Sequence, residues 1–307
     1  MTSRPEAVGK VSAAWMMVLA TVLFALMGVC VKQASAEVTT AEVVFFRGLV
    51  GALMVGGMAW AQRLPLRTNV PRQHLGRGLA GVSALTLWFY AIGHLPLATA
   101  VTLNYMSSVW MAAFLMLRQA WRRWHRVPHR AMPGGLLAAV MLGFVGVGLV
   151  LRPTLERDQW LEAAIGLVSG MLSAWAYLQV AGLGRSGEPE HRVVFYFSVF
   201  GAVAGLGMMA ATHLSGHQAW ASPTPQGWAW LLAIGVFATV AQLAMTRAYA
   251  RGQPLAMASL QYLGIVHAFI LGIWFFGEAA HGVAIVGTGL IVLAGVAANR
   301  LGRDLKA

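Results

Sequence analysis

Ten apolar stretches of about membrane-spanning length follow one another along this chain, and they constrain its fold more than any other feature. They lie at 11–31, 41–61, 75–94, 97–117, 133–151, 161–181, 193–213, 227–247, 255–276 and 282–299. A helix rises about 1.5 Å per residue and the hydrocarbon layer is about 30 Å thick, so roughly 17–25 residues span it. Because backbone amides must be hydrogen-bonded within lipid, we predict an all-α integral membrane protein with ten transmembrane helices.

Composition agrees with a chain that lies almost wholly in the membrane. Hydrophobic residues make up 58% of the 307 residues and charged residues only 10%, whereas about a quarter of a soluble domain is charged. The connections between the apolar stretches are about 15 residues or shorter, too short to bury a core of their own. We therefore predict one membrane domain over 1–307.

The basic residues predict the orientation of the chain. If the N-terminus is cytoplasmic, 18 Lys and Arg fall in cytoplasmic segments, among them four in 62–78, and three fall in outer loops. This bias follows the positive-inside rule and predicts cytoplasmic N- and C-termini in the inner (plasma) membrane. The Arg- and Trp-rich segment 118–130 is interpreted as an anchor for lipid headgroups, so the net charge of +12 does not indicate a nucleic-acid partner. The single cysteine, Cys30, excludes a disulfide framework.

The two halves of the chain resemble each other, over approximately 11–151 and 161–299. VVFFRGLVGA (43–52) aligns with VVFYFSVFGA (193–202), and YAIGHLPLATAVTLNY (90–105) aligns with YARGQPLAMASLQY (249–262). Because each half holds five predicted helices, an odd number, the second copy must be inverted in the membrane. Inverted repeats are typical of secondary transporters, which open a central site to either side in turn.

These features resemble the drug/metabolite transporter superfamily, in its EamA family. The similar segments are VKQAS (31–35), AEVVFFRGLVGAL (41–53) and FFGEAAHGVAIVGTGLIVLAGV (275–296). The resemblance implies two inverted five-helix repeats. Within the family the chain looks most similar to YddG-type exporters of aromatic and other amino acids. It departs from the family pattern in having no Glu in the first half at the place that matches Glu278.

Two amide–tyrosine pairs recur in the repeats and are the first candidates for substrate binding. Asn104 and Tyr105 follow Pro96, and Gln261 and Tyr262 follow Pro254. An amide offers both a donor and an acceptor, which suits the charged groups of a zwitterion. The alternative is that these amides form hydrogen bonds between helices.

Aromatic and polar side chains inside the spans form the second candidate set. Aromatic walls would bind an amphipathic substrate through burial and stacking, although lipid contact or helix packing explains each residue equally well. A glutamine at membrane depth adds a polar group. The candidates are Trp88, Tyr90, Trp110, Trp175, Tyr177 and Gln242.

Three ionisable residues are candidates for coupling or gating. His267 lies near the centre of its stretch and would carry a proton or act as a neutral packing group. Arg47 would neutralise a substrate carboxylate or have a structural role, and Glu278 would gate the outer mouth or cap a helix. No Asp or Glu lies in the central part of any stretch, which favours a neutral or zwitterionic substrate over a cation.

The sequence therefore predicts a secondary transporter that exports amino acids, aromatic and other neutral ones, or related small metabolites by alternating access. The alternative is a multidrug, cationic-compound or nucleotide-sugar carrier on the same fold. Neither an HExxH nor a GxSxG motif is present, so an enzyme is not expected. We expect no cofactor and no metal, and a small molecule and membrane lipids as partners of a monomer or weak homodimer.

Overall fold

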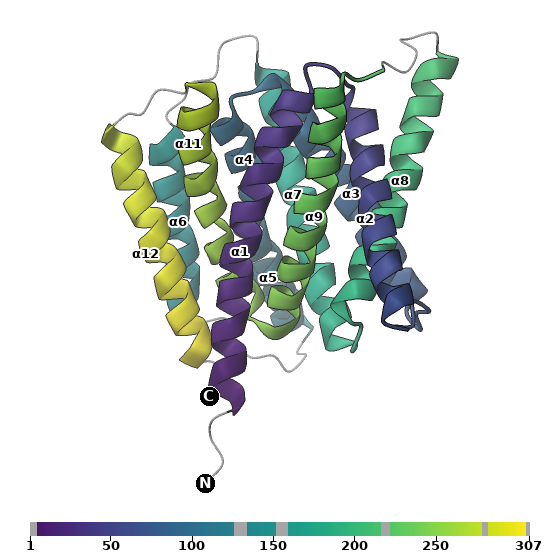
Figure 1. Cartoon of the computed structure of the whole chain (residues 1–307). Coiled ribbons are helices and arrows are strands. Elements are labelled where there is room, and N and C mark those ends of the chain that lie inside the picture. Colours follow the sequence, from purple (N-terminus) through teal and green to yellow (C-terminus); the bar gives the residue numbers. More distant parts are fainter. Residues whose placement is uncertain (1–4, 126–133, 152–158, 216–221, 278–281, 305–307) are drawn as a thin grey trace.

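The computed structural model describes residues 5–125, 134–151, 159–215, 222–277 and 282–304, and these residues form a bundle of helices joined by short connections (Figure 1). The described part of the chain contains twelve helices: α1 (Pro5–Ala34), α2 (Thr40–Ala61), α3 (Pro71–His94), α4 (Leu97–Tyr105), α5 (Ser107–Trp124), α6 (Gly134–Leu151), α7 (Trp160–Arg185), α8 (Glu190–Leu214), α9 (Pro225–Arg251), α10 (Pro254–Gln261), α11 (Leu263–Phe276) and α12 (Gly282–Asp304).

The twelve helices make ten membrane crossings, which confirms the predicted all-α membrane fold. One residue separates α4 from α5 and one separates α10 from α11, so each pair forms a single crossing. Eight crossings contain helices that are long and apolar enough to span a bilayer. The other two, α6 and α12, contain shorter apolar segments at Leu137–Gly146 and Ile285–Ala294.

The two interruptions, at Met106 and Tyr262, were not predicted from the sequence. Both residues keep right-handed helical backbone angles, so the chain continues in nearly the same direction. The backbone tightens there: Val109 N donates to Met106 O at 3.0 Å and Ile265 N donates to Tyr262 O at 3.0 Å. Such i→i−3 turns within a helix often mark functional positions.

Local sequence explains where several helices begin. Thr39 and Glu42 form a capping box before α2, in which the Thr39 amide donates to the Glu42 carboxylate at 2.7 Å. Thr224 caps α9 by accepting a hydrogen bond from Gly227 N at 3.1 Å. Pro225 and Pro254 start α9 and α10, where a missing amide hydrogen costs nothing.

The two halves of the chain pack against each other through matching pairs of helices. The most extensive contacts join α2 with α8, α1 with α9, α6 with α12 and α3 with α7. Exchanging the first six helices for the last six leaves this set of pairs unchanged. Because each half crosses the membrane five times, the halves are related as inverted repeats.

Small residues let α2 and α8 approach closely. A Cβ added at Gly48 would lie 2.7 Å from the Ser198 carbonyl oxygen, and one added at Gly51 would lie 2.6 Å from Ser198 Oγ. On the other helix, Gly205 lies against the backbone of Phe45. This backbone-to-backbone packing is the membrane counterpart of a small-xxx-small seam.

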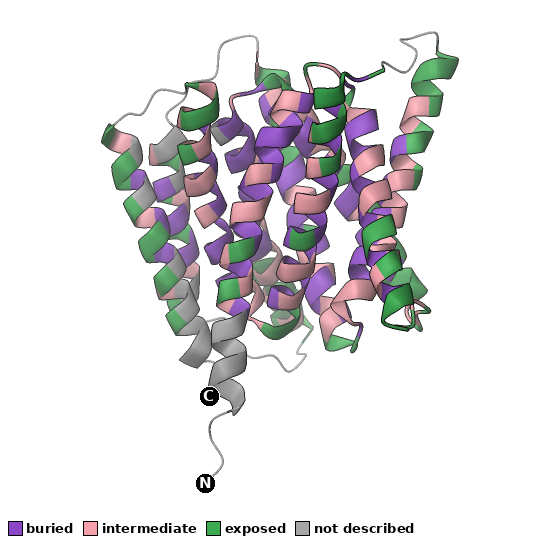
Figure 2. Ribbon diagram, in the orientation of Figure 1, coloured by how far each residue is buried: buried purple, intermediate pink, exposed green. Residues whose placement is uncertain are grey.

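Burial places the core between the two halves. Figure 2 shows buried residues concentrated in the inner helices, while the outer faces are exposed. Several exposed tryptophans lie near helix ends, among them Trp60, Trp124 and Trp274, as expected for an interfacial aromatic belt. The start of α1 and the end of α12 lie at the same end of the bundle (Figure 1), which an even number of crossings requires.

Candidate substrate-binding cavity

A cavity of about 450 Å³, its opening included, lies among α1, α2, α3, α4, α7, α8 and α9. Both repeats contribute to its wall, which combines aromatic rings with a small number of polar groups. The lining residues are Phe24, Arg47, Arg77, Gly81, Ala84, Leu85, Trp88, Asn104, Tyr105, Ser173, Ala176, Tyr177, Phe197 and Gln242.

Two arginines dominate the electrostatics of the cavity. Arg47 and Arg77 are both buried, and their guanidinium carbons lie 4.7 Å and 4.0 Å from the centre of the Phe197 ring. Arg47 Nη2 donates to Gln242 Oε1 over a long 3.5 Å. Cation–π contacts with a buried ring stabilise such charges only in part. The cavity therefore holds two positive charges close together.

The described residues provide no counter-ion for these charges. The ion pairs of this part of the chain involve Glu188 and Glu190, and no acidic side chain is among the residues that line the cavity. Nε and Nη1 of Arg47 and of Arg77 are buried and make no hydrogen bond. Buried unpaired charge is costly, and inside a membrane it is a mark of function.

The two arginines reach the cavity from opposite membrane faces. Arg47 lies seven residues into α2 and Arg77 six residues into α3, which is about 10 Å along each helix. Because α2 and α3 are consecutive crossings, they run in opposite directions, and the long side chains converge at Phe197. Gly81 makes room for this, since a Cβ there would clash with Nη1 of Arg77.

Amide and hydroxyl groups form a second part of the wall. Asn104 Nδ2 donates to Ser169 Oγ at 2.8 Å and to Ser173 Oγ at 3.0 Å, which ties α4 to α7. The Tyr105 ring lies 6.4 Å from that of Trp88, in a tilted arrangement. These groups give the cavity polar positions within aromatic walls.

The structure places six of the predicted site residues at the cavity and the others elsewhere. Those at the cavity are Arg47, Trp88, Asn104, Tyr105, Tyr177 and Gln242. Those that do not line it are Tyr90, Trp110, Trp175, Gln261, Tyr262 and His267. Glu278 lies outside the described residues.

Helix geometry explains why two of the aromatic candidates are not at the cavity. Ser173 and Tyr177 are four residues apart and share one face of α7, whereas Trp175 lies on the opposite face and is 53% exposed. Tyr90 is likewise two residues from Trp88, and its ring stacks on His94 at 4.1 Å.

The remaining candidates are occupied by packing. Gln261 is buried and accepts a hydrogen bond from the Tyr249 hydroxyl at 2.9 Å. Tyr262 is fully buried against Gly143, and His267 is partly buried with an unpartnered Nδ1. Trp110 is partly buried and packs against the core beyond the break at Met106.

Arg77 is the charged cavity residue that the sequence analysis does not identify. It was counted with the cytoplasmic basic residues of 62–78, although the predicted apolar stretch 75–94 already contained it. Two features of the sequence indicate that Arg77 lies within the membrane: it falls in both ranges, and Gly78 and Gly81 follow it closely. Phe197 was missed because an apolar ring in an apolar helix has no distinguishing pattern.

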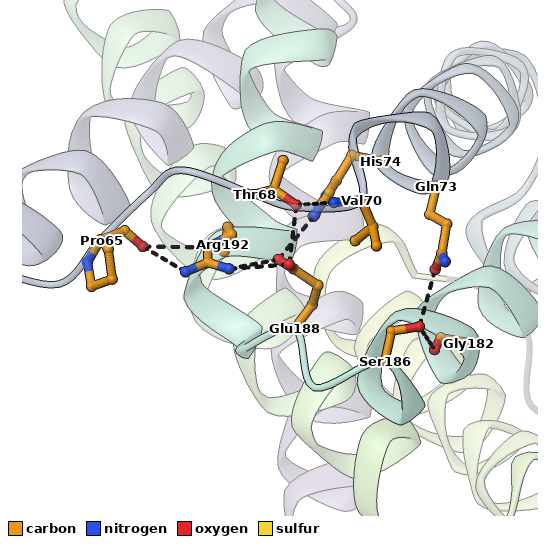
Figure 3. A network of polar contacts seen from close by, with 9 residues as sticks. All are labelled: Pro65, Thr68, Val70, Gln73, His74, Gly182, Ser186, Glu188 and Arg192. Carbon is orange, nitrogen blue, oxygen red and sulfur yellow. Dashed lines mark hydrogen bonds and ion pairs between the residues drawn. The ribbon is translucent and has the colours of Figure 1, made fainter.

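A polar cluster ties the two repeats together at one end of the bundle (Figure 3). Glu188, between α7 and α8, accepts hydrogen bonds from Thr68 Oγ1 at 3.0 Å and from His74 Nε2 at 3.1 Å. Arg192 Nη1 donates to Glu188 at 3.0 Å, and Arg192 Nη2 donates to the Pro65 carbonyl at 3.1 Å. We call Pro65, Thr68, His74, Glu188 and Arg192 the Glu188 latch.

The environment of Glu188 favours its charged form. Burial acts to raise the pKa of this carboxyl, but the hydrogen bonds from His74 and Thr68 and the charge of Arg192 lower it by more. The pKa of Glu188 therefore lies below the ordinary glutamate value, and the latch is formed at neutral pH.

A second contact between a carboxylate and a threonine connects the two repeats, away from the Glu188 latch. Glu37, between α1 and α2, accepts hydrogen bonds from the amide and hydroxyl of Thr224, at 2.9 Å and 2.8 Å. We call this pair the Glu37 latch. In each latch a carboxylate between the first two helices of one repeat accepts from a threonine that precedes the third crossing of the other repeat. Inversion of the repeats places the two latches at opposite ends of the bundle.

A polar cavity between two inverted repeats of five crossings, with a latch at each end, defines a secondary transporter of small molecules rather than an enzyme. The EamA-like transporter family model matches residues 11–152 and 160–299. The chain belongs to this family, and the matches confirm the predicted presence of two copies of one unit.

Named relatives carry different small molecules. The chain is 32% identical to a pseudopaline exporter of Pseudomonas aeruginosa, over 92% of this chain and 94% of that protein. It is 25% identical to a riboflavin transporter of Rhizobium johnstonii, over 96% and 94% of the two chains. An S-adenosylmethionine uptake transporter of Rickettsia bellii is 22% identical over 80% of each chain. A crystal structure superposes with a TM-score of 0.74 at 17% identity and covers 96% of this chain and 99% of that one, which supports the fold.

Proposed function

We propose that this protein exports amino acids, or related small metabolites that carry a carboxylate, from the cell by alternating access. One observation carries the proposal: the cavity between the repeats combines the unpaired guanidinium groups of Arg47 and Arg77 with aromatic walls. A guanidinium binds a carboxylate through two parallel hydrogen bonds, and the aromatic rings suit an apolar side chain. Aromatic amino acids as substrates are supported by these walls alone, since the named relatives carry pseudopaline, riboflavin and S-adenosylmethionine.

The same charges argue against the alternative of a cationic-compound carrier. Like charges brought within a few ångströms in a water-poor cavity repel strongly, and no described carboxylate in the wall offsets them. A nucleotide sugar, which is an anion, is compatible with the charges, so the transport test must include one.

The orientation and location of the protein are part of this proposal. The distribution of basic residues supports an inner-membrane protein with both termini in the cytoplasm. In that orientation the Glu188 latch lies at the cytoplasmic end and the Glu37 latch at the outer end. Alternating access would require the two latches to open in turn.

Counterflow in liposomes tests the proposal. Purified protein should exchange labelled phenylalanine and other labelled amino acids against an unlabelled internal pool, and a dication such as methyl viologen should not compete. Trp175→Ala serves as a control because this side chain lies outside the cavity. Absence of exchange for every amino acid, together with exchange of a cationic dye or UDP-glucose, would replace the proposal with one of its alternatives.

A further inference from the structure

We infer that the cavity is built for a substrate with two acidic groups, one for each of Arg47 and Arg77. This inference rests on the proposed transport function and narrows its substrate class. It also corrects the expectation of a neutral or zwitterionic substrate, because that expectation takes account of the missing central acidic residues but not of the second arginine that lines the cavity.

The unsatisfied atoms of the cavity all point to an anion. Among its described lining residues, the buried polar atoms without a partner are Nε and Nη1 of Arg47, Nε and Nη1 of Arg77, Trp88 Nε1 and Gln242 Nε2. Each of these is an N–H donor, and none is an acceptor. Because buried donors are normally satisfied, the missing partner must supply several acceptor oxygens.

The two guanidinium groups each keep unpartnered donors. Nε and Nη2 share one edge of a guanidinium and Nη1 and Nη2 share another, and each edge can donate to both oxygens of one carboxylate. In Arg47 and in Arg77, Nε and Nη1 are buried without a partner, so each edge of each group keeps an unpartnered donor. One carboxylate can occupy only one of these edges fully, so a monocarboxylate would leave the other guanidinium buried and unpaired.

The spacing of the charges fits a small molecule with two acidic groups. The guanidinium carbons lie 4.7 Å and 4.0 Å from one ring centre, so they are at most about 9 Å apart, and salt screens buried charges at that distance only weakly. At that range the two charges repel each other, and a bound dianion would remove the repulsion. Two carboxylates separated by a few bonds span such a gap.

Ligand-induced stabilisation of the purified protein tests this inference with matched probes. Glutamate is compared with glutamine, and isophthalate with benzoate, at constant ionic strength. We expect each dicarboxylate to bind at least tenfold more tightly than its partner, because a charge-assisted hydrogen bond contributes about 1.5–3 kcal/mol. Equal affinity within both pairs would overturn the inference.

Variants assign the preference to the arginines. Arg47→Gln and Arg77→Gln should each abolish the discrimination, whereas Arg72→Gln, an exposed position on the same helix as Arg77, should retain it. Retention of the discrimination in either cavity variant would contradict the inference.

Two further readouts separate binding from folding and from transport. Without ligand, Arg77→Gln should unfold at the same or a higher temperature than wild type, because it removes uncompensated buried charge. A markedly lower unfolding temperature for both cavity variants would assign the arginines to packing and overturn the inference. If counterflow succeeds for neutral amino acids but no dicarboxylate is preferred, the two-acid inference fails and the transport proposal stands.

Discussion

At the residue scale, Asn104 is the amide with the clearest place in the candidate site. It lines the cavity, and its amide nitrogen holds Ser169 and Ser173 in position. We predict that Asn104→Ala lowers the counterflow rate about tenfold, since losing one or two hydrogen bonds costs about 1–2 kcal/mol. The amount of folded, monodisperse protein should stay close to wild type. An unchanged rate would move Asn104 to a packing role.

Gln261 has the corresponding position in the second repeat but a different environment. Its amide oxygen accepts from the Tyr249 hydroxyl, and both side chains are buried. We predict that Gln261→Ala lowers the free energy of unfolding by about 1–3 kcal/mol, because it leaves a buried hydroxyl without its acceptor. Thermal unfolding measures this effect, and Tyr249→Phe combined with Gln261→Ala should recover part of the loss. If the double variant is no more stable than the single one, this account is wrong.

These two amides show how far residue-level prediction reaches. The repeat in the sequence made Asn104 and Gln261 equivalent, yet only Asn104 lines the cavity. The two repeats do not line the cavity with equivalent residues. Which of two equivalent amides faces the cavity depends on helix packing, and a sequence motif does not encode that packing. Trp175 and Tyr177 differ in the same way. Both are aromatic and were predicted to bind substrate, but only Tyr177 lies on the face of α7 that lines the cavity.

At the element scale, contact between α2 and α8 depends on glycine. A Cβ at Gly48 would overlap the backbone of α8, whereas one at Gly57, on the same helix, meets nothing within 4 Å. We predict that Gly48→Ala destabilises the protein by about 1–3 kcal/mol through overpacking. Gly57→Ala should be neutral or stabilising by up to about 1 kcal/mol, since alanine favours a helix. Thermal unfolding of the two variants side by side checks this, and equal effects would contradict it.

The Glu188 latch connects two loops, and its strength should depend on pH. Because the pKa of Glu188 is lowered in the folded protein, its contribution is fully present above the ordinary pKa of about 4.3 and is lost as pH falls below that value. We predict that Glu188→Gln unfolds at a lower temperature than wild type at pH 7 and that the gap narrows toward pH 3.5. A gap that is constant with pH would mean that the carboxylate charge is not what stabilises the latch.

The elements themselves were predictable to a large extent. Apolar length located all ten crossings, because a membrane leaves the backbone no alternative to helix. The breaks at Met106 and Tyr262 were not predictable, since neither residue is a helix breaker and no local sequence signal marks the i→i−3 turns there. The latches were not predictable either, because they join loops more than 100 residues apart in sequence.

At the scale of the whole molecule, inversion of the repeats predicts which loops face which compartment. With cytoplasmic termini, the loop that holds Ala36 faces outward and the loop that holds Ser186 faces inward. A membrane-impermeant maleimide added to intact cells should label Ala36→Cys and not Ser186→Cys. The native Cys30 is buried and should give little background. Labelling of Ser186→Cys alone would reverse the orientation, and labelling of both would contradict the inverted arrangement.

The pair of unpaired arginines also gives the whole transporter an electrical asymmetry. An empty carrier would hold two uncompensated charges in the membrane field, whereas a carrier loaded with a dianion would be neutral there. A charge that crosses the full field at 100 mV gains or loses about 2.3 kcal/mol. Even a displacement of these side chains by a tenth of the membrane thickness would therefore make the return of the empty carrier voltage-sensitive, by about 0.5 kcal/mol at 100 mV. The membrane potential would then set the turnover rate through the unloaded step rather than through the step that carries the substrate.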